Sequence, residues 1–181
     1  MNATFELLSP RLRLRRLERD DAAAICQYRS LPEVARFQSW ESFTAEDAAT
    51  LIADQERIAP NTPGTWLQLL LTLPERATVV GDCGIHFLPH DTQQVELGIT
   101  LAPEYQGQGL AAEALASVLR YLFDSLGKHR VLAVTDAENR AAANLFRRLG
   151  FRQEAHFVEN IWYKGAWGSE FVFALLKQEW R

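Results

Sequence analysis

The chain has 181 residues, of which 48% are hydrophobic and 23% are charged, a balance typical of an ordered globular protein with one domain over residues 1–181. Its formal net charge of −4 argues against nucleic acid as the main partner, because such proteins carry clustered basic residues. The apolar tracts are strand-sized and the first residues lack a leader pattern, so we expect a cytoplasmic protein with no membrane partner.

Two helices are expected in the first third of the chain. An aspartate at position 20 or 21 can cap a helix that runs to about Arg29, because a short acidic side chain accepts hydrogen bonds from the first backbone NH groups. Thr44 and Asp47 have the spacing of a capping box, which predicts a second helix that runs to about Arg57.

The loop between these helices carries two aromatic side chains, Phe37 and Trp40. Loops on rigid scaffolds often contact substrate, but aromatic residues in such places also fill the edge of a core, and both interpretations stay open here. After the second helix, apolar residues predict two neighbouring strands over 66–73 and 78–88.

A further strand shows a regular alternation of apolar and polar positions. Its apolar residues are Val95, Leu97, Ile99 and Leu101. Because successive strand residues point to opposite faces of a sheet, the carboxylate of Glu96 is expected to face away from Val95.

A glycine-rich turn, residues 103–111, leads from this strand into an amphipathic helix expected over 109–126. Gly107 and Gly109 carry no Cβ atom, so the backbone can bend tightly and approach a ligand. The unpaired NH groups of a first helical turn attract phosphate oxygens. The turn therefore predicts a phosphate site, although the same glycines also suit a tight strand-to-helix connection.

The last third predicts a second strand and helix, followed by a hairpin. Residues 131–134 form a short apolar run, and 139–149 read as a helix closed by Gly150. Two strands joined by a helix imply one parallel pair. The remaining segments, 151–163 and 169–176, predict a terminal antiparallel hairpin.

The residues around the glycine-rich turn resemble one known family. The spacing Gln106-x-x-Gly109-x-Ala111 is similar to the acyl-CoA pyrophosphate motif of the GNAT superfamily of N-acetyltransferases. Residues 96–99 look like the fourth strand of that family, and 139–151 look like its second conserved helix. Residues 9–22 are similar to the opening of the RimJ/RimL-type branch, which acetylates the N-termini of ribosomal proteins.

This resemblance implies a fold and an activity. The fold would be a mixed, mostly antiparallel sheet with a parallel central pair, flanked by helices. The activity would be transfer of an acetyl group from acetyl-CoA to a primary amine by direct attack in a ternary complex. The acceptor would be an amine-bearing small molecule or a protein N-terminus, and the family allows a homodimer.

The resemblance also implies positions for the acetyl-CoA site. The expected cofactor-binding residues are Ile99, Thr100, Leu101, Gln106, Gly107, Gln108, Gly109, Leu110, Ala111, Asn139 and Asn144. Backbone NH groups of the turn would bind the pyrophosphate, and the strand would pair with the amide-bearing pantetheine arm. Asn139 is either a hydrogen-bonding partner of the cofactor or a helix cap.

The resemblance implies candidates for the catalytic base but leaves the catalytic acid open. Glu96 is the first choice for the base that deprotonates the amine, and His86 is the second. The family commonly places a tyrosine or a serine where this chain has Phe146 and Ala142, and neither can donate a proton. The general acid stays open between Asn144, Tyr163, a water molecule and no dedicated acid.

On the acceptor side, the expected substrate-binding residues are Phe37, Trp40, Glu96 and Trp162. Cys26 and Cys83 have neither metal-site nor redox-motif spacing and are expected to be buried free thiols, with no bound metal.

Two other functions fit parts of the sequence. Gly107-x-Gly109-x-x-Ala112 also satisfies the dinucleotide fingerprint, with Asp136 about two dozen residues later, which would indicate a nicotinamide-dependent oxidoreductase. Only one crossover follows this turn, which leaves no room for a second mononucleotide-binding half. A non-catalytic acyl-CoA-binding module is the other alternative, because the usual tyrosine or serine is missing.

Overall fold

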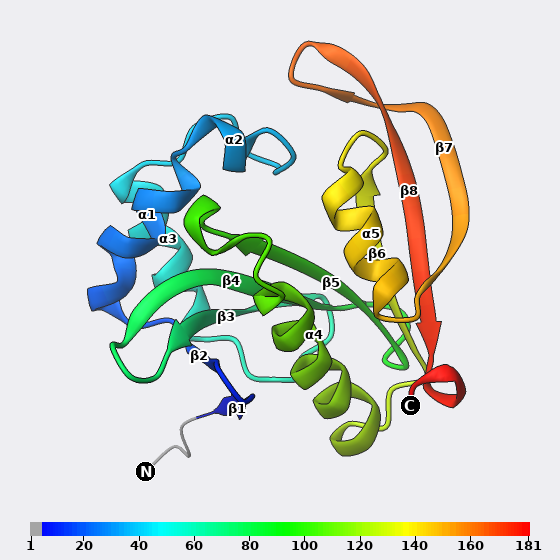
Figure 1. The fold of residues 1–181 in the computed structure, drawn as a ribbon, viewed down its shortest axis with the longest axis horizontal. Coiled ribbons are helices and arrows are strands. Elements are labelled where there is room, and N and C mark those ends of the chain that lie inside the picture. The colour runs from blue at the N-terminus through cyan, green and yellow to red at the C-terminus, as the bar shows by residue number, and fades with distance from the viewer. Residues whose placement is uncertain (1–4) are drawn as a thin grey trace.

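In the computed structural model, which describes residues 5–181, eight strands form one mixed sheet in the order β1-β2-β3-β4-β5-β6-β8-β7 (Figure 1). The strands are β1 (Glu6–Leu8), β2 (Arg13–Arg16), β3 (Thr65–Leu73), β4 (Thr78–Phe87), β5 (Gln94–Leu101), β6 (Arg130–Asp136), β7 (Arg152–Tyr163) and β8 (Ala166–Leu176). Neighbouring strands are antiparallel except β5 and β6, which are parallel. The expected mixed sheet with a parallel central pair is confirmed.

The helices flank both faces of this sheet. They are α1 (Ala22–Arg29), α2 (Pro32–Ala35), α3 (Ala45–Gln55), α4 (Leu110–Arg120) and α5 (Arg140–Arg148), with short 3₁₀ turns at Arg19–Asp21, Pro103–Tyr105 and Lys177–Glu179. In Figure 1, α1, α2 and α3 gather at one end of the sheet, and the β7–β8 hairpin, in orange and red, stands at the other. Within residues 5–181, no helix is long and apolar enough to cross a lipid bilayer.

Most expected elements are confirmed, with differences at their ends. The capping box at Thr44 is present: Asp47 N donates to Thr44 Oγ1 at 3.2 Å, and Thr44 N donates to Asp47 Oδ2 at 2.7 Å. The helix expected over 109–126 is α4 followed by a π-helical turn over Tyr121–Ser125. Neither β1 nor the single-turn helix α2 was predicted, because both are too short to show a hydrophobic period.

The larger core lies between the sheet and α4. Alternate residues of β3 and β4, together with one stripe of α4, are fully buried on this face; they include Leu67, Leu69, Cys83, Ile85, Leu115 and Val118. A smaller core on the opposite face packs α1 and α3 onto the sheet through Ile25, Tyr28, Ile52 and Leu70. This second face carries the polar side chains of β4 and β5.

The parallel β5–β6 ladder is short. Only Gln94, Val95 and Glu96 pair with β6, through Arg130, Val131 and Leu132 respectively, whereas β5 pairs with β4 along most of its length. The two parallel strands therefore separate after Glu96. This single parallel pair contradicts the dinucleotide-binding alternative, which needs successive parallel crossovers.

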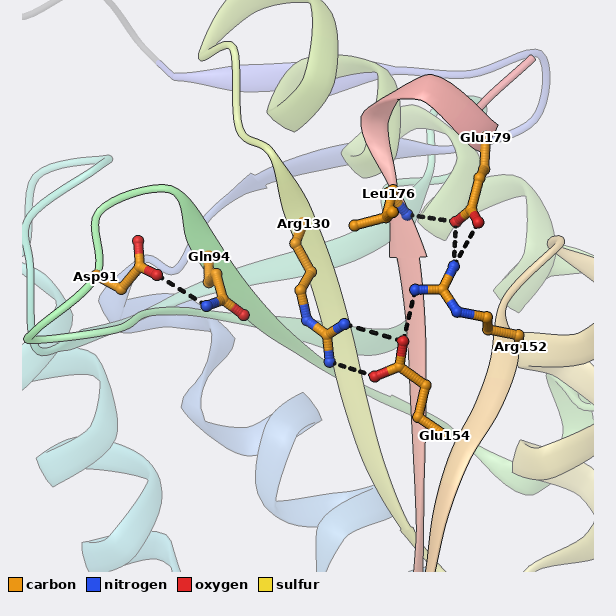
Figure 2. Close-up of polar contacts among 7 residues, drawn as sticks. All are labelled: Asp91, Gln94, Arg130, Arg152, Glu154, Leu176 and Glu179. Atoms are coloured by element: carbon orange, nitrogen blue, oxygen red, sulfur yellow. Dashed lines mark hydrogen bonds and ion pairs between the residues drawn. The ribbon is translucent and has the colours of Figure 1, made fainter.

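Ion pairs link β6 to β7 and to the end of the chain (Figure 2). Arg130 forms two hydrogen bonds with Glu154, at 3.0 and 2.6 Å. Glu154 also accepts from Arg152, which in turn bonds to Glu179 after β8. These contacts tie β6, β7 and the end of the chain together beside the paired end of β5.

A buried carboxylate anchors α1 to the second face of the sheet. Asp82 on β4 is 2% exposed and accepts hydrogen bonds from Arg29 Nε at 3.0 Å and Nη2 at 2.7 Å. Tyr28 and Gln68 also donate to Asp82. Burial alone would lower the pKa of Arg29, but the adjacent Asp82 carboxylate raises it above its ordinary value, so the guanidinium stays charged.

We expect Asp82→Asn to lower the free energy of unfolding by about 3–5 kcal/mol, because it leaves the Arg29 charge buried without a counterion. The matched control is Glu56→Gln, which breaks the exposed Arg19–Glu56 pair and is expected to change stability little. Urea unfolding of both variants measures the difference. Equal stability of the two variants would contradict a dominant role for the buried pair.

Candidate active site

A cleft of about 460 Å³ opens where β5 and β6 separate. One wall is the end of β5, and a second is the glycine-rich turn with the first turn of α4. The third wall is α5, where Asn139, Ala142, Asn144 and Arg148 line the cleft, and the fourth is α2 with the loop after it.

The β5 wall exists because the parallel ladder stops. Ile99, Thr100 and Leu101 line the cleft, and none of them pairs with β6. Backbone polar groups that lose a ladder partner need another one. This edge of β5 can therefore pair with an extended, amide-bearing ligand.

The glycine-rich turn presents the positive end of α4 to the cleft. Gly107 and Gly109 have φ angles of 72° and 80°, a left-handed conformation that glycine adopts without strain. Leu110, Ala111 and Ala112, the first helical residues, also line the cleft. Their NH groups have no partner within the helix, and together with the helix dipole they favour an anionic ligand.

Side chains of the turn brace its backbone. Gln106 Nε2 donates to the carbonyl of Leu101 at 3.1 Å, and Gln108 Nε2 donates to the carbonyl of Glu104 at 2.7 Å. Gln106 also lines the cleft, whereas Gln108 does not.

A second brace comes from the N-terminal segment. Glu113 in the first turn of α4 accepts from Ser9 Oγ, Arg11 N and Arg11 Nε, each at 2.7 Å. Arg11 Nη1 donates to the carbonyl of Gln108 at 3.1 Å. Partial burial would raise the pKa of Glu113, but the hydrogen bonds from Ser9 and Arg11 outweigh it and lower that pKa. Sequence reasoning missed this brace, although an acidic residue in a first helical turn was a usable signal.

On the α5 wall, the Asn139 side chain caps the helix. Its Oδ1 accepts from Ala142 N at 3.1 Å, so the helix-cap interpretation is confirmed, and its position in the cleft lining is compatible with the cofactor role as well. Asn144 is nearby, and its Oδ1 accepts from Arg147 at 3.4 Å. Arg148 also lines the cleft, and sequence reasoning did not single it out.

Glu96 and His86 are cross-strand partners on the face of the sheet that carries α1 and α3. His86 Nδ1 lies 3.4 Å from Glu96 Oε2, and the imidazole stacks on Trp66 with ring centroids 4.6 Å apart. Glu96 is the last β5 residue paired with β6. Neither side chain is part of the cleft lining, which begins on β5 at Ile99, three residues beyond Glu96.

The three aromatic residues that were expected to bind substrate lie in three different surroundings. Phe37 lines the cleft. Trp40 lies beside Arg29 instead: its Nε1 donates to the Arg29 carbonyl at 3.0 Å, and the Arg29 guanidinium lies over its ring. Trp162 is 60% exposed on the β7–β8 hairpin and contacts Trp167. Trp40 and Trp162 are thus separate from the cleft wall.

The positions that the family uses for a general acid carry no proton donor here. Ala142 lines the cleft, and Phe146 is buried against Phe151 and Phe173.

Cys83 is fully buried, and burial raises the pKa of its thiol, with Asp82 adding to the shift. A thiolate nucleophile at this position is therefore unfavourable at neutral pH, whereas Cys26 is a partly buried free thiol.

The tip of the β7–β8 hairpin reaches over to α2 (Figure 1). Lys164 Nζ donates to the carbonyl of Ala35 at 2.5 Å. On the α5 side, Arg36 pairs with Glu138 at 3.2 Å. Contacts from two directions thus hold α2, which forms one wall of the cleft.

Comparison with known proteins agrees with this geometry. Residues 11–152 match the family model described as "Acetyltransferase (GNAT) domain". Over 178 residues, the chain is 30% identical to the uncharacterized N-acetyltransferase p20 of Bacillus licheniformis, covering 96% of this chain and 97% of that protein.

Two further matches have named activities. The [ribosomal protein uS5]-alanine N-acetyltransferase of Escherichia coli is 31% identical over 84 residues, which cover 46% of this chain and 43% of that enzyme. The crystal structure of spermidine N-acetyltransferase from Vibrio cholerae, in complex with CoA and spermine, has a TM-score of 0.80 and 22% identity, covering 93% of this chain and 97% of that one.

We expect Glu113→Gln to destabilise the protein by about 1–2 kcal/mol at pH 7, because three charge-assisted hydrogen bonds are weakened. The pKa of Glu113 is lowered in the folded state. The Glu113 carboxylate therefore stabilises the fold fully at pH values above its pKa in the unfolded chain. This stabilisation is lost as the pH falls through the pKa of Glu113 in the folded protein.

Urea unfolding at pH 7 and at about pH 3 measures this difference between wild type and variant. The matched control is Glu75→Gln on the exposed β3–β4 turn, which is expected to change stability little. A deficit of Glu113→Gln that is the same at both pH values would contradict the prediction.

Proposed function

The chain belongs to the GNAT family of acetyl-CoA-dependent N-acetyltransferases, and we propose that it acetylates a primary amine by direct attack within a ternary complex. One observation carries this proposal. A single cleft extends from the NH groups at the start of α4 along Ile99–Leu101, the part of β5 that no longer pairs with β6, and the Glu96 carboxylate lies three residues before Ile99 on the same strand. The cleft thus has a site for an anion at one end and a candidate base, Glu96, near the other.

The proposed acetyl-CoA site follows the walls of the cleft. The pyrophosphate would bind NH groups of residues 107–111, where left-handed glycines give the close approach that it needs. The pantetheine arm would lie along Ile99–Leu101 and take the place of the missing β6 partner. On the opposite wall, Asn139, Asn144 and Arg148 supply polar groups.

The proposed chemistry requires a neutral amine. Glu96 accepts the proton of the incoming ammonium, and His86, 3.4 Å from that carboxylate, assists it. The amine nitrogen then attacks the thioester carbonyl carbon, and a C–N bond forms. The attacking nitrogen, now cationic, releases its second proton to solvent. Collapse of the tetrahedral intermediate then re-forms the carbonyl, breaks the C–S bond and releases CoA as a thiolate, and Glu96 returns its proton to solvent.

No side-chain acid is assigned to this last step. Ala142 and Phe146 have no proton to donate, and Asn144 is a very weak acid. Tyr163 lies in the hairpin next to Lys164, outside the cleft lining. A thiolate is a comparatively good leaving group, so we propose that it departs without a dedicated donor and takes its proton from solvent.

The proposed acceptor is a primary amine at the end of a narrow, flexible chain. Lys164 and Ala35 connect the hairpin to α2 over the acceptor side, which favours a slender molecule. Both a polyamine and an unfolded protein N-terminus have this shape, and relatives act on spermidine and on a ribosomal protein. A homodimer and a cytoplasmic location stay predictions.

We expect Gly109→Val to weaken CoA binding by about tenfold or more, because a β-branched residue is strained at a left-handed φ and shifts the NH groups of the turn. The matched control is Gly127→Val after α4. Gly127 is also left-handed, with φ of 66°, and its side chain would meet open space. We expect both variants to lose stability but only Gly109→Val to lose CoA affinity, measured by calorimetry. Equal CoA affinity of the two variants would refute the pyrophosphate assignment.

We expect the wild-type protein to release CoA thiol from acetyl-CoA only when an acceptor amine is added. The panel contains spermidine, other small amines and a peptide that begins with alanine. Glu96→Gln is expected to lower kcat by about a hundredfold or more with CoA affinity unchanged, whereas the α3 surface variant Glu46→Gln keeps wild-type rates.

Two outcomes of this assay would count against the proposal. Tight CoA binding with no amine-dependent release would favour the non-catalytic acyl-CoA-binding alternative. Unchanged kcat in Glu96→Gln, at every pH tested, would remove Glu96 from the role of base.

A further inference from the structure

One position on β5 is a glycine that its backbone conformation does not require. Glu96, Gly98 and Thr100 alternate onto the same face of the strand. Gly98 is not among the glycines with positive φ, and a methyl group there would meet no atom within 4 Å. Glycine in a strand interior is usually destabilising, so folding alone gives no reason for it here.

The neighbouring glycine on β4 explains how the surface beside Gly98 is shaped. Gly84 is the cross-strand partner of Gly98. A Cβ atom at Gly84 would come within 3.0 Å of Trp66 Cε3 and 3.1 Å of Gln68 Oε1. The absence of a side chain at Gly84 therefore lets the Trp66 indole lie close to the sheet.

Trp66 is exposed in spite of this close packing. Its ring is stacked on His86 with an interplanar angle of 10°, yet the residue remains 41% exposed. His86 in turn contacts Glu96. An apolar, electron-rich surface thus lies next to the proposed base, on the face of the sheet that carries α1 and α3.

We propose that the surface over Gly98, between the Trp66 indole and the Glu96 carboxylate, binds the reacting end of the acceptor. Gly98 and Trp66 would then be determinants of acceptor specificity. The inference rests on the proposed function, because it assigns one side of that reaction. It gives a role to two residues, Gly98 and Trp66, to which the sequence analysis assigned none.

Position and chemistry both support this assignment. Thr100, two residues beyond Gly98 on the same face, already lines the cleft, so Gly98 lies between the cleft and the base. An indole binds the CH₂ groups and the cationic head of an alkylamine by dispersion and cation–π attraction. A side chain at Gly98 would occupy the place where such an amine must approach the thioester.

The test compares Gly98→Ala, Gly98→Val and Trp66→Ala with wild type. Calorimetry measures CoA affinity and then spermidine binding to the CoA complex, and thiol release gives kcat and KM. We expect melting temperature and CoA affinity to stay close to wild type. We expect kcat/KM for the acceptor to fall about tenfold in Gly98→Ala and further in Gly98→Val.

The Trp66 variants are expected to change the acceptor KM more than kcat, and they have a matched control. Trp66→Ala is expected to raise the acceptor KM about tenfold with a smaller change in kcat, and Trp66→Phe is expected to restore most of the loss. Phe157→Ala removes a comparably exposed aromatic residue from β7 (49% exposed) and is expected to change neither value.

Failure of this inference differs from failure of the proposed function. If wild type neither binds nor acetylates any amine of the panel, the proposed function is wrong, and the acceptor assignment falls with it. If wild type is active and the Gly98 and Trp66 variants keep its acceptor kinetics, only the present inference is overturned. Loss of CoA affinity in Gly98→Ala would place this surface on the donor side and would also overturn it.

Discussion

The short ladder between β5 and β6 is the constraint on which the other features of the site depend. Three residue pairs join these strands, and the last pair is Glu96 with Leu132. On the other side of β6, the Arg130–Glu154 contacts join that strand to β7 across β8 (Figure 2). Beyond it, β5 has a free edge, and buried or ligand-facing backbone groups require a partner. The end of this ladder therefore leaves a free edge of β5 along the cleft, which is the proposed pantetheine site, and leaves the Glu96 carboxylate at the last paired position.

Two long-range electrostatic contacts keep the walls of this opening in place. The Asp82–Arg29 pair fixes α1 on the sheet, and Arg29 also holds Trp40 through its carbonyl and its guanidinium. This anchors the segment on either side of α2. At the glycine-rich turn, the contact of Arg11 with Glu113 and with the Gln108 carbonyl has the same effect. Since both walls are fixed before a ligand arrives, little ordering is needed on binding.

Local sequence signals predicted most of the elements but not their assembly. The alternation around Val95 predicted β5, the Thr44–Asp47 spacing predicted the start of α3, and the glycines predicted the turn before α4. Contacts between distant residues left no local signal: Arg11 and Glu113 are 102 positions apart. The position of Trp40 was open for the same reason, because an aromatic residue in a loop has the same local pattern whether it contacts a ligand or an arginine.

The two sides of the site differ in how far sequence can describe them. The proposed donor side depends on backbone NH groups, and the sequence needs only glycines and a helix start to present them, so a short motif marks it. The proposed acceptor side is built from side chains on separate strands, Trp66 on β3, His86 on β4 and Glu96 on β5, which meet through strand register. Substitution at any one of them changes the acceptor surface without altering the motif. Members of the family can therefore share a donor and differ in acceptor, and the acceptor must be inferred from the register of the sheet.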